Sequence, residues 1–173
     1  MKFHHQPLFV ILIILTLPLN MICCGNKQNQ KKGKVSRILL LKGERKLTLY
    51  SKEQIIRTYK VSLGKTPKGA KQRQGDGKTP EGLYYIDWRN PNSKFHLSLH
   101  ISYPDAKDKQ RAIKGGYDPG GDIMIHGMKN KLGFIGFLHR AFDWTNGCVA
   151  VTDSEIEEIW ELVPNGTPIE IRP

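Results

Sequence analysis

Two short apolar segments of this sequence each have, at one end, a residue that can take part in acyl transfer. The segment "IMIHG" delivers His126 near its end, and "NGCVAV" presents Cys148 near its start. A cysteine thiolate is a nucleophile, and a nearby imidazole takes the thiol proton and can lower the thiol pKa. Gly147 lets the backbone approach closely, so the amides around Cys148 could donate to a developing oxyanion. The hydroxyl of Thr145 could orient a ligand or the turn.

The elements that must position these residues are mostly strands. Short apolar or alternating runs, separated by Gly, Pro and charged turns, are typical of strands. In "FHLSLHISY" the alternation is strict, with histidine and serine on one face and Leu, Ile and Tyr on the other. Strands are therefore expected at residues 36–42, 45–51, 54–64, 79–88, 95–103, 123–127, 148–151 and 167–172. The sequence predicts one mainly β domain over residues 34–173.

One clear helix is expected near the C-terminus. Thr152 and Glu155 form a capping box, so the helix begins at Asp153. Its apolar face consists of Ile156, Ile159, Trp160 and Val163. Asn165-Gly166 ends it, and residues 128–144 are predicted to be helical in part.

The N-terminal segment predicts export. Residues 8–19 form a nearly pure apolar run that is short for a bilayer span of ~20 residues, so residues 1–24 fit a secretory signal. Cys23-Cys24-Gly25 resembles a bacterial lipobox, which makes Cys24 the candidate for lipidation. An ordinary signal peptide and a retained anchor are the alternatives, and residues 25–33 are expected to be a polar tether. The expected location is the periplasm or cell envelope, with membrane contact only through such a lipid or an uncleaved signal.

Cysteine usage and charge leave several possibilities open. Cys148 has no partner in residues 25–173, so in an exported protein it is either a buried inert thiol or a reactive one. The net charge is +11, with basic runs at 27–37 and 64–78. Such runs favour polyanions such as cell-wall polymers or lipid headgroups, although flexible solvated loops would show the same composition. Export argues against nucleic acid as the partner.

"IMIHG" followed by "TNGCVAV" resembles the L,D-transpeptidase catalytic domain of bacteria, also called the YkuD domain. That family has His-Gly, a spacer, then Ser or Thr, any residue, Gly, Cys and an apolar residue. The resemblance extends to "LLLKGERKLTLYS", "GKTPEGLYYIDWRNP" and "GTPIEI". It implies a β-rich sandwich-like or barrel-like fold with one or two short helices.

The resemblance also implies an activity. Cys148 would be the nucleophile and His126 the base, with Gly147 and Thr145 at the motif's Gly and Ser/Thr positions. Family members form an acyl-enzyme with a peptidoglycan stem peptide and pass the acyl group to an amine of another stem or of a wall-anchored lipoprotein. In a hydrolytic relative, a carboxypeptidase, endopeptidase or amidase, water takes the acyl group. No metal or organic cofactor is implied.

Three features depart from the family pattern. The spacer between His126 and Thr145 has 18 residues, slightly more than usual. Asn146 stands where many members have His or Lys, and Ala150 stands where many have Arg or Asn. These departures bear on substrate contacts more than on the nucleophile.

Four residues are candidates for substrate binding: Arg89, His96, His139 and Asn146. Each also has an ordinary structural interpretation as a surface, strand-face or turn residue. Trp144 could likewise floor the cleft or belong to the core.

Two rival functions come from other classes. His96, His100 and His126 could supply three ligands to a catalytic zinc ion, although no His-x-x-Glu-His signature is present. Alternatively, the basic loops could make the protein a non-catalytic module that binds the cell wall.

Overall fold

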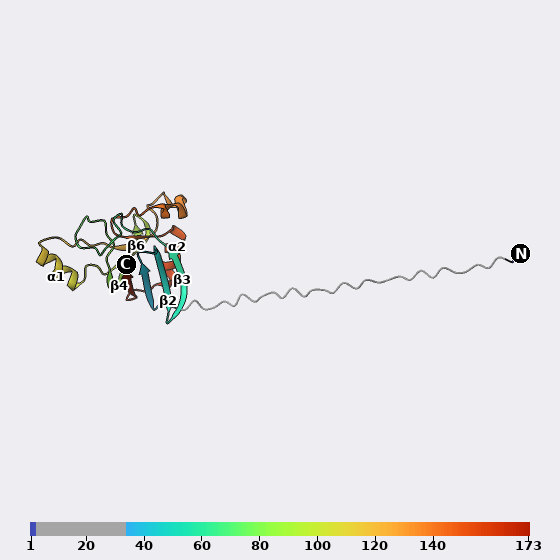
Figure 1. Ribbon diagram of the computed structural model, residues 1–173, viewed down its shortest axis with the longest axis horizontal. Helices are drawn as coiled ribbons and strands as arrows, with labels where there is room; N and C mark the ends of the chain where they lie inside the picture. The colour runs from blue at the N-terminus through green and yellow to red at the C-terminus, as the bar shows by residue number, and fades with distance from the viewer. Residues whose placement is uncertain (3–33) are drawn as a thin grey trace.

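The computed structural model describes residues 1, 2 and 34–173 (Figure 1). The expected signal at 1–24, lipidation at Cys24 and the tether at 25–33 therefore lie almost wholly outside the described residues. Within the described part of the chain, no helix is long and apolar enough to cross a membrane.

Eight strands form one sheet in the order β3-β2-β1-β8-β4-β5-β6-β7. Their bounds are β1 Arg37–Leu41, β2 Lys46–Ser51, β3 Gln54–Lys60, β4 Gly82–Ser93, β5 His96–Ile101, β6 Met124–His126, β7 Val149–Ala150 and β8 Pro168–Arg172. The predicted β-rich fold and each predicted strand are confirmed. The C-terminal β8 lies between β1, to which it is parallel, and β4, to which it is antiparallel, so the two ends of the domain are joined at the centre of the sheet.

The core forms because the strands alternate in polarity. Leu40, Leu47 and Leu49 are fully buried on neighbouring strands, and the apolar residues of β5 and β6 extend the same core. The helix α2 (Asp153–Leu162) buries Ile156 and Ile159 against it. Its predicted capping box is present, with the side chain of Thr152 accepting from the Glu155 N–H. α2 thus covers β5 and β6, the two strands that lead to His126.

Two other helical segments complete the fold. The 3-10 segment η1 (Gly133–Ala141) lies inside the stretch predicted to be partly helical. The helix α1 (Ala106–Gly115) was not expected, because it has little apolar face and buries only Asp108 and Ala112. Its stability comes instead from a capping box between Asp105 and Asp108 and from a left-handed C-cap at Gly116.

The loop at residues 64–81, which contains the basic run 64–78, is held by hydrogen bonds to buried lysines. The alternative of a flexible solvated loop is therefore wrong for its central part. Lys42 is 2% exposed and donates from Nζ at 2.8 Å to three acceptors, Gly69 O, Thr79 O and Glu81 Oε1. Lys71 is also buried and donates to Asp76 Oδ1 at 2.9 Å. Buried lysines need such partners, and here the partners fix the course of the loop.

Candidate active site

Cys148 follows a tight turn whose shape depends on Thr145. The Thr145 hydroxyl donates to Cys148 O at 2.8 Å and accepts from Gly147 N–H at 3.1 Å. Gly147 has φ 129°, and a Cβ there would lie 2.6 Å from Lys78 O, so only glycine fits. Because the Gly147 N–H is already bonded to Thr145, Gly147 shapes the turn, and donation to an oxyanion falls to other groups.

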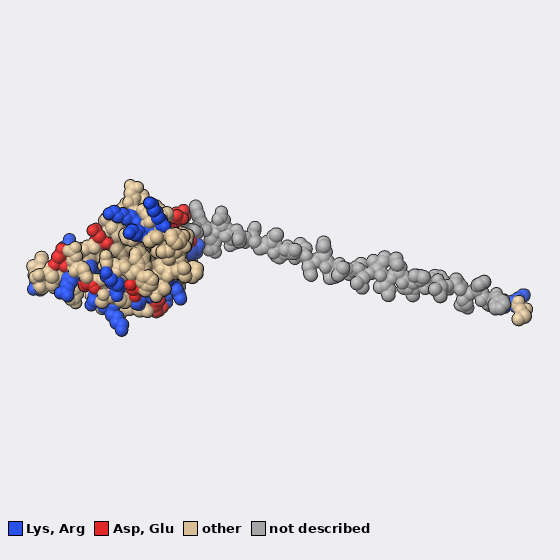
Figure 2. All heavy atoms as spheres, turned by 90° about the horizontal axis from the view of Figure 1, so that it is seen from above, with Lys and Arg blue, Asp and Glu red and all other residues tan. Residues whose placement is uncertain are grey.

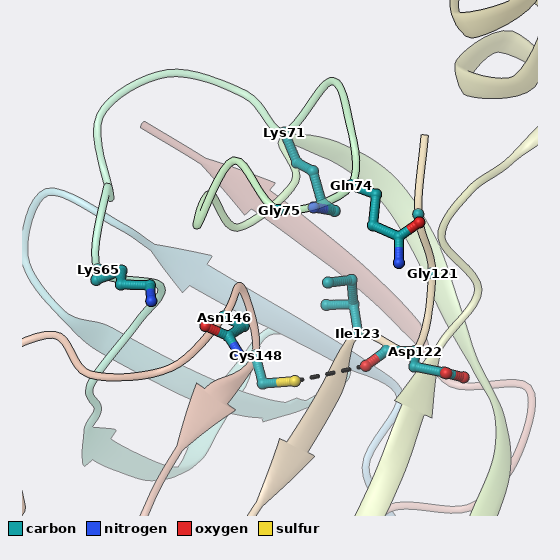
Figure 3. Close-up of a pocket in the computed structure, with 10 residues that line it drawn as sticks. Lys65, Lys71, Gln74, Gly75, Gly121, Asp122, Ile123, Asn146 and Cys148 are labelled. Carbon is teal, nitrogen blue, oxygen red and sulfur yellow. Dashed lines mark hydrogen bonds between the residues drawn. The ribbon is translucent and has the colours of Figure 1, made fainter. Parts of the chain in front are cut away.

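The Cys148 thiol lies where two hollows meet. One, of about 490 Å³, is lined by the loop residues Lys65, Lys71 and Gln74 together with Asn146 (Figure 3). The other, of about 450 Å³, lies on the β5–β6 side and also includes His126. A substrate crossing both hollows would pass directly over the sulfur.

The thiol is half-buried and protonated at rest. Its Sγ–H donates to Asp122 O at 3.5 Å, drawn as the dashed line in Figure 3. Burial raises the pKa of Cys148, and the nearby Asp122 raises it further, while the Met124 N–H and the Lys71 ammonium oppose the shift. A thiol in this state can act as a nucleophile only if a base removes its proton.

His126 is placed to be that base. It ends β6, is buried, and donates from Nδ1 to Gly127 O at 2.6 Å, which leaves Nε2 as the proton acceptor. Gly127 is held in turn by its N–H, which donates to Phe95 O at 3.1 Å, and the Phe95 ring lies against the imidazole with centroids 4.5 Å apart. Burial lowers the pKa of His126 to about 4, so the imidazole is neutral at neutral pH.

The lowered pKa of His126 predicts a loss of stability in acid. The unfolded chain takes up this proton near pH 6.5 and the folded one only near pH 4, so the stabilisation is complete above pH 6.5 and is lost as the pH falls to 4. The shift corresponds to about 3 kcal/mol at 1.36 kcal/mol per pKa unit. We expect urea unfolding of the wild type to lose that much more stability between pH 7 and pH 4 than unfolding of His126→Asn. Parallel pH profiles for the two proteins would contradict the assignment.

The structure separates the four candidate substrate contacts. Asn146 lines the loop-side hollow next to Cys148. Arg89 does not line either hollow: its guanidinium donates to Trp160 O at 2.7 Å and lies over the Trp160 ring, which fixes the C-terminal end of α2. His96 also lies outside both hollows and bonds Glu157 at 2.7 Å. The structure thus places Arg89 and His96 in contacts with α2 rather than beside the thiol, and their part in substrate binding stays a prediction.

His139 is buried but bonded away from the thiol. Ser62 Oγ–H donates to His139 O at 2.9 Å, so the Nδ1–H of His139 donates to Ser62 Oγ at 3.1 Å. The ring stands edge-on to Trp144, which in turn contacts the rings of His126 and Phe95. His139 thus supports the wall behind His126 and lines a third, apolar hollow rather than the cleft at Cys148.

The three histidines proposed for zinc have separate partners. His100 bonds Asp87 at 2.6 Å and stacks on Trp88, while His96 and His126 bond Glu157 and Gly127. Across residues 34–173, no group of three His, Cys, Asp or Glu side chains is placed to hold a metal ion. The donor geometry therefore does not fit the zinc hydrolase hypothesis.

Sequence reasoning missed Lys71 and Asp76. Asp76 accepts from Lys71 Nζ and from the N–H groups of Gln72, Arg73 and Lys78. Burial opposes its ionisation, but these donors together outweigh burial and lower the pKa of Asp76. The result is a buried ion pair that holds a cation in the wall of the Cys148 hollow. The only signal in the sequence is Asp76 between two glycines, five residues after a lysine.

A curled β-rich sheet of this kind is the fold of the L,D-transpeptidases. Residues 36–171 match the family model of the L,D-transpeptidase catalytic domain, YkuD, and the chain belongs to this family.

Known relatives agree with the assignment. Over 143 residues the chain is 33% identical to YafK of Escherichia coli strain K12, which is provisionally named an L,D-transpeptidase; the match covers 79% of this chain and 50% of YafK. Bd1075 of Bdellovibrio bacteriovorus is similar in structure with a TM-score of 0.57 and 25% identity, over 83% of this chain and 50% of that one. The cell shape determining protein Pgp2 of Campylobacter jejuni has a TM-score of 0.60 and 24% identity, over 81% and 48%. The chain thus spans about half the length of these relatives.

Proposed function

We propose that this protein is an exported peptidoglycan-modifying cysteine enzyme, an L,D-transpeptidase that acts on stem peptides through an acyl-enzyme on Cys148. The observation that carries the proposal is the orientation of His126. Its Nδ1–H bond to Gly127 O leaves a bare, neutral Nε2 in the hollow that also contains the Cys148 thiol. A neutral histidine beside a protonated thiol is the resting state that general-base activation requires.

The proposed chemistry is an acyl transfer in two steps. As the Cys148 sulfur attacks the carbonyl carbon of a stem peptide bond, its proton passes to His126 Nε2. The carbon–nitrogen bond then breaks, and the leaving amine takes that proton, which leaves a thioester on Cys148. An acceptor amine attacks the thioester, gives up a proton through His126, and releases the thiol. Water in place of the amine gives hydrolysis.

The surroundings of the thiol suit a charged peptide. Stem peptides carry carboxylates, and Lys65 and Lys71 line the loop-side hollow together with the neutral polar Asn146. The ammonium of Lys71 is held in place by Asp76, so it is a fixed hydrogen-bond donor in the wall of this hollow. We propose that peptidoglycan stem peptides lie across both hollows, and that a lysine of a wall-anchored lipoprotein is a possible acceptor.

The proposal includes a location. The apolar run at 8–19 supports export to the periplasm or cell envelope, and Cys24 is the proposed lipid attachment site. An acyl mass on a mature N-terminal Cys24 would support lipidation, and a mature N-terminus elsewhere would contradict it.

The function is tested by mass spectrometry of muropeptides incubated with the purified protein. We expect new cross-linked or exchanged stem peptides with the wild type and none with Cys148→Ala. Hydrolysed stems without cross-links would identify water as the acceptor and place the protein among the hydrolytic relatives. Binding to peptidoglycan without any thiol-dependent product would instead support the non-catalytic wall-binding module.

A further inference from the structure

A cluster of large apolar side chains projects from the segment around η1. We define the η1 face by its exposed members, Leu132, Phe134, Phe137, Leu138 and Phe142. We propose that the η1 face is a membrane-docking surface that inserts into the headgroup region of an anionic bilayer beside the active site.

The exposure of this cluster is concentrated. The described residues have eleven large exposed hydrophobic side chains, and five of them lie between 132 and 142, whereas the others are distributed over several elements. Phe134 is 84% exposed and Phe137 69%. Exposed apolar patches on soluble domains mark surfaces that bind a protein or a membrane.

The backbone of η1 is interrupted at a glycine. η1 consists of two short 3-10 turns joined at Gly136, whose φ of 52° is non-helical. Phe134 precedes this break and Phe137 follows it, and both side chains are exposed. His139 is the buried residue of η1.

The charge around the η1 face favours an anionic surface. Residues 128–142 contain Lys129, Lys131 and Arg140 and no aspartate or glutamate. Lys129 and Lys131 are exposed at the N-terminal border of the face. Figure 2, seen from the side on which η1 lies in Figure 1, shows an uncharged tan area with Lys and Arg side chains beside it. In space, Arg140 is paired with Glu155 at 2.6 Å, and Asp153 accepts from the Met128 N–H at 2.8 Å. The basic character of the face therefore rests on Lys129 and Lys131, and exposed apolar side chains with lysines beside them are the pattern of membrane-surface segments.

A hollow beneath the η1 face adds room for an inserted chain. It has a volume of about 450 Å³ and is lined by Met128, Ile135, Leu138, Phe142 and Trp144, among others. Trp144 Nε1 is buried there with no hydrogen-bond partner among the described residues. Trp144 therefore reports on what enters the hollow rather than contacting lipid through its N–H.

The N-terminal segment would keep the domain close to a membrane if the apolar run or a lipid on Cys24 entered it. The apolar run ends at Leu19, and the segment 20–33 can span at most about 50 Å when fully extended. Whatever membrane the run or a lipid on Cys24 enters is therefore within reach of the domain. A second copy of the chain is a poorer partner, because two faces that each carry Lys129 and Lys131, on chains with a net charge of +11, would repel.

The test uses the full chain with vesicles of phosphatidylglycerol and phosphatidylcholine whose acyl chains carry bromine, which quenches tryptophan only in direct proximity. We expect quenching of the wild type and little of Trp144→Phe, since Trp88 and Trp160 lie outside the hollow. The triple variant Phe134→Ser, Phe137→Ser, Phe142→Ser should fall to the level of Trp144→Phe. The matched control Ile55→Ser, Leu83→Ser, Ile113→Ser removes exposed apolar side chains elsewhere and should behave as the wild type.

Each outcome decides the proposal without reference to catalysis, so its failure is distinct from failure of the proposed function. Unchanged melting transitions would show that both triple variants are folded. Membrane docking would be overturned if the wild type showed no quenching. It would also be overturned if the triple serine variant of Phe134, Phe137 and Phe142 were quenched as strongly as the wild type. Membrane docking would likewise be overturned if sedimentation without vesicles showed self-association of the wild type that the triple serine variant had lost. The η1 face would then be an interface between two copies of the chain. Equal quenching by vesicles of phosphatidylcholine alone would overturn the role of anionic lipid.

Discussion

Replacing His126 by alanine is expected to lower the rate of Cys148 acylation by about 10²–10⁴-fold, the usual contribution of a general base. The imidazole Nε2 is the neutral acceptor in the hollow that contains the thiol, and the thiol has a raised pKa and cannot ionise readily by itself. His139→Ala should lower the rate about tenfold at most, the size of a lost positioning contact. Its Nδ1 is bonded to Ser62, and its ring reaches the site only through Trp144.

The measurement is the single-turnover acylation rate of each variant with one muropeptide donor. Melting transitions of both variants must be compared first, because each histidine is buried and leaves a cavity when truncated. His126→Gln is a second variant that keeps much of the volume and should remain as inactive as alanine. A nearly inactive His139→Ala together with an active His126→Ala would mean that the base lies in the spacer and that the motif assignment is wrong.

The strands and α2 could be predicted because their signals are local. Each strand has its own alternation or apolar run, and α2 begins at a capping box that the sequence displays in full. The helix α1 has neither an apolar stripe nor a buried face of any size, so periodicity could not find it. Its signal was the pair of aspartates at 105 and 108, which is a cap without the apolar run that usually follows.

The candidate site was predictable only where a motif spans it. Cys148, His126, Thr145 and Gly147 lie in two short segments, and the sheet places β6 and β7 side by side in parallel, which unites them. Whether these residues catalyse the reaction remains a prediction.

The partners of the other candidates come from distant parts of the chain. Arg89 meets Trp160 across 71 positions, and His96 meets Glu157 across 61. A histidine or arginine in a strand gives no indication of which long-range acceptor it will find. The burial of Lys71 could not be predicted for the same reason, since it depends on how the whole loop folds back.

Gly64→Ala is expected to destabilise the protein by about 3 kcal/mol, the upper part of the usual range for overpacking. A Cβ at Gly64 would lie 2.2 Å from Gly77 O and 2.9 Å from Gly147 Cα. Both neighbours are backbone atoms, so no side chain can rotate away to make room. Gly64 pairs with Thr145 next to the turn that carries Cys148, with Lys65 N–H donating to Thr145 O at 3.0 Å. Relief of the clash must therefore move either the loop or the turn that carries Cys148.

The matched control is Gly43→Ala, whose added Cβ would approach Pro173 no closer than 3.7 Å. Neither glycine has a positive φ, so the pair differs in available space rather than in backbone preference. We expect Gly43→Ala to change the free energy of unfolding by less than about 1 kcal/mol. Urea unfolding measures this difference. The Gly64 variant should also acylate Cys148 about 10²-fold more slowly where it is folded, since a shift of about 1 Å at a reacting group has that effect. Equal stability and equal acylation rates in the two variants would contradict this prediction. They would show that the loop around Gly77 moves at little cost and that the contact between Gly64 and Gly147 does not position Cys148.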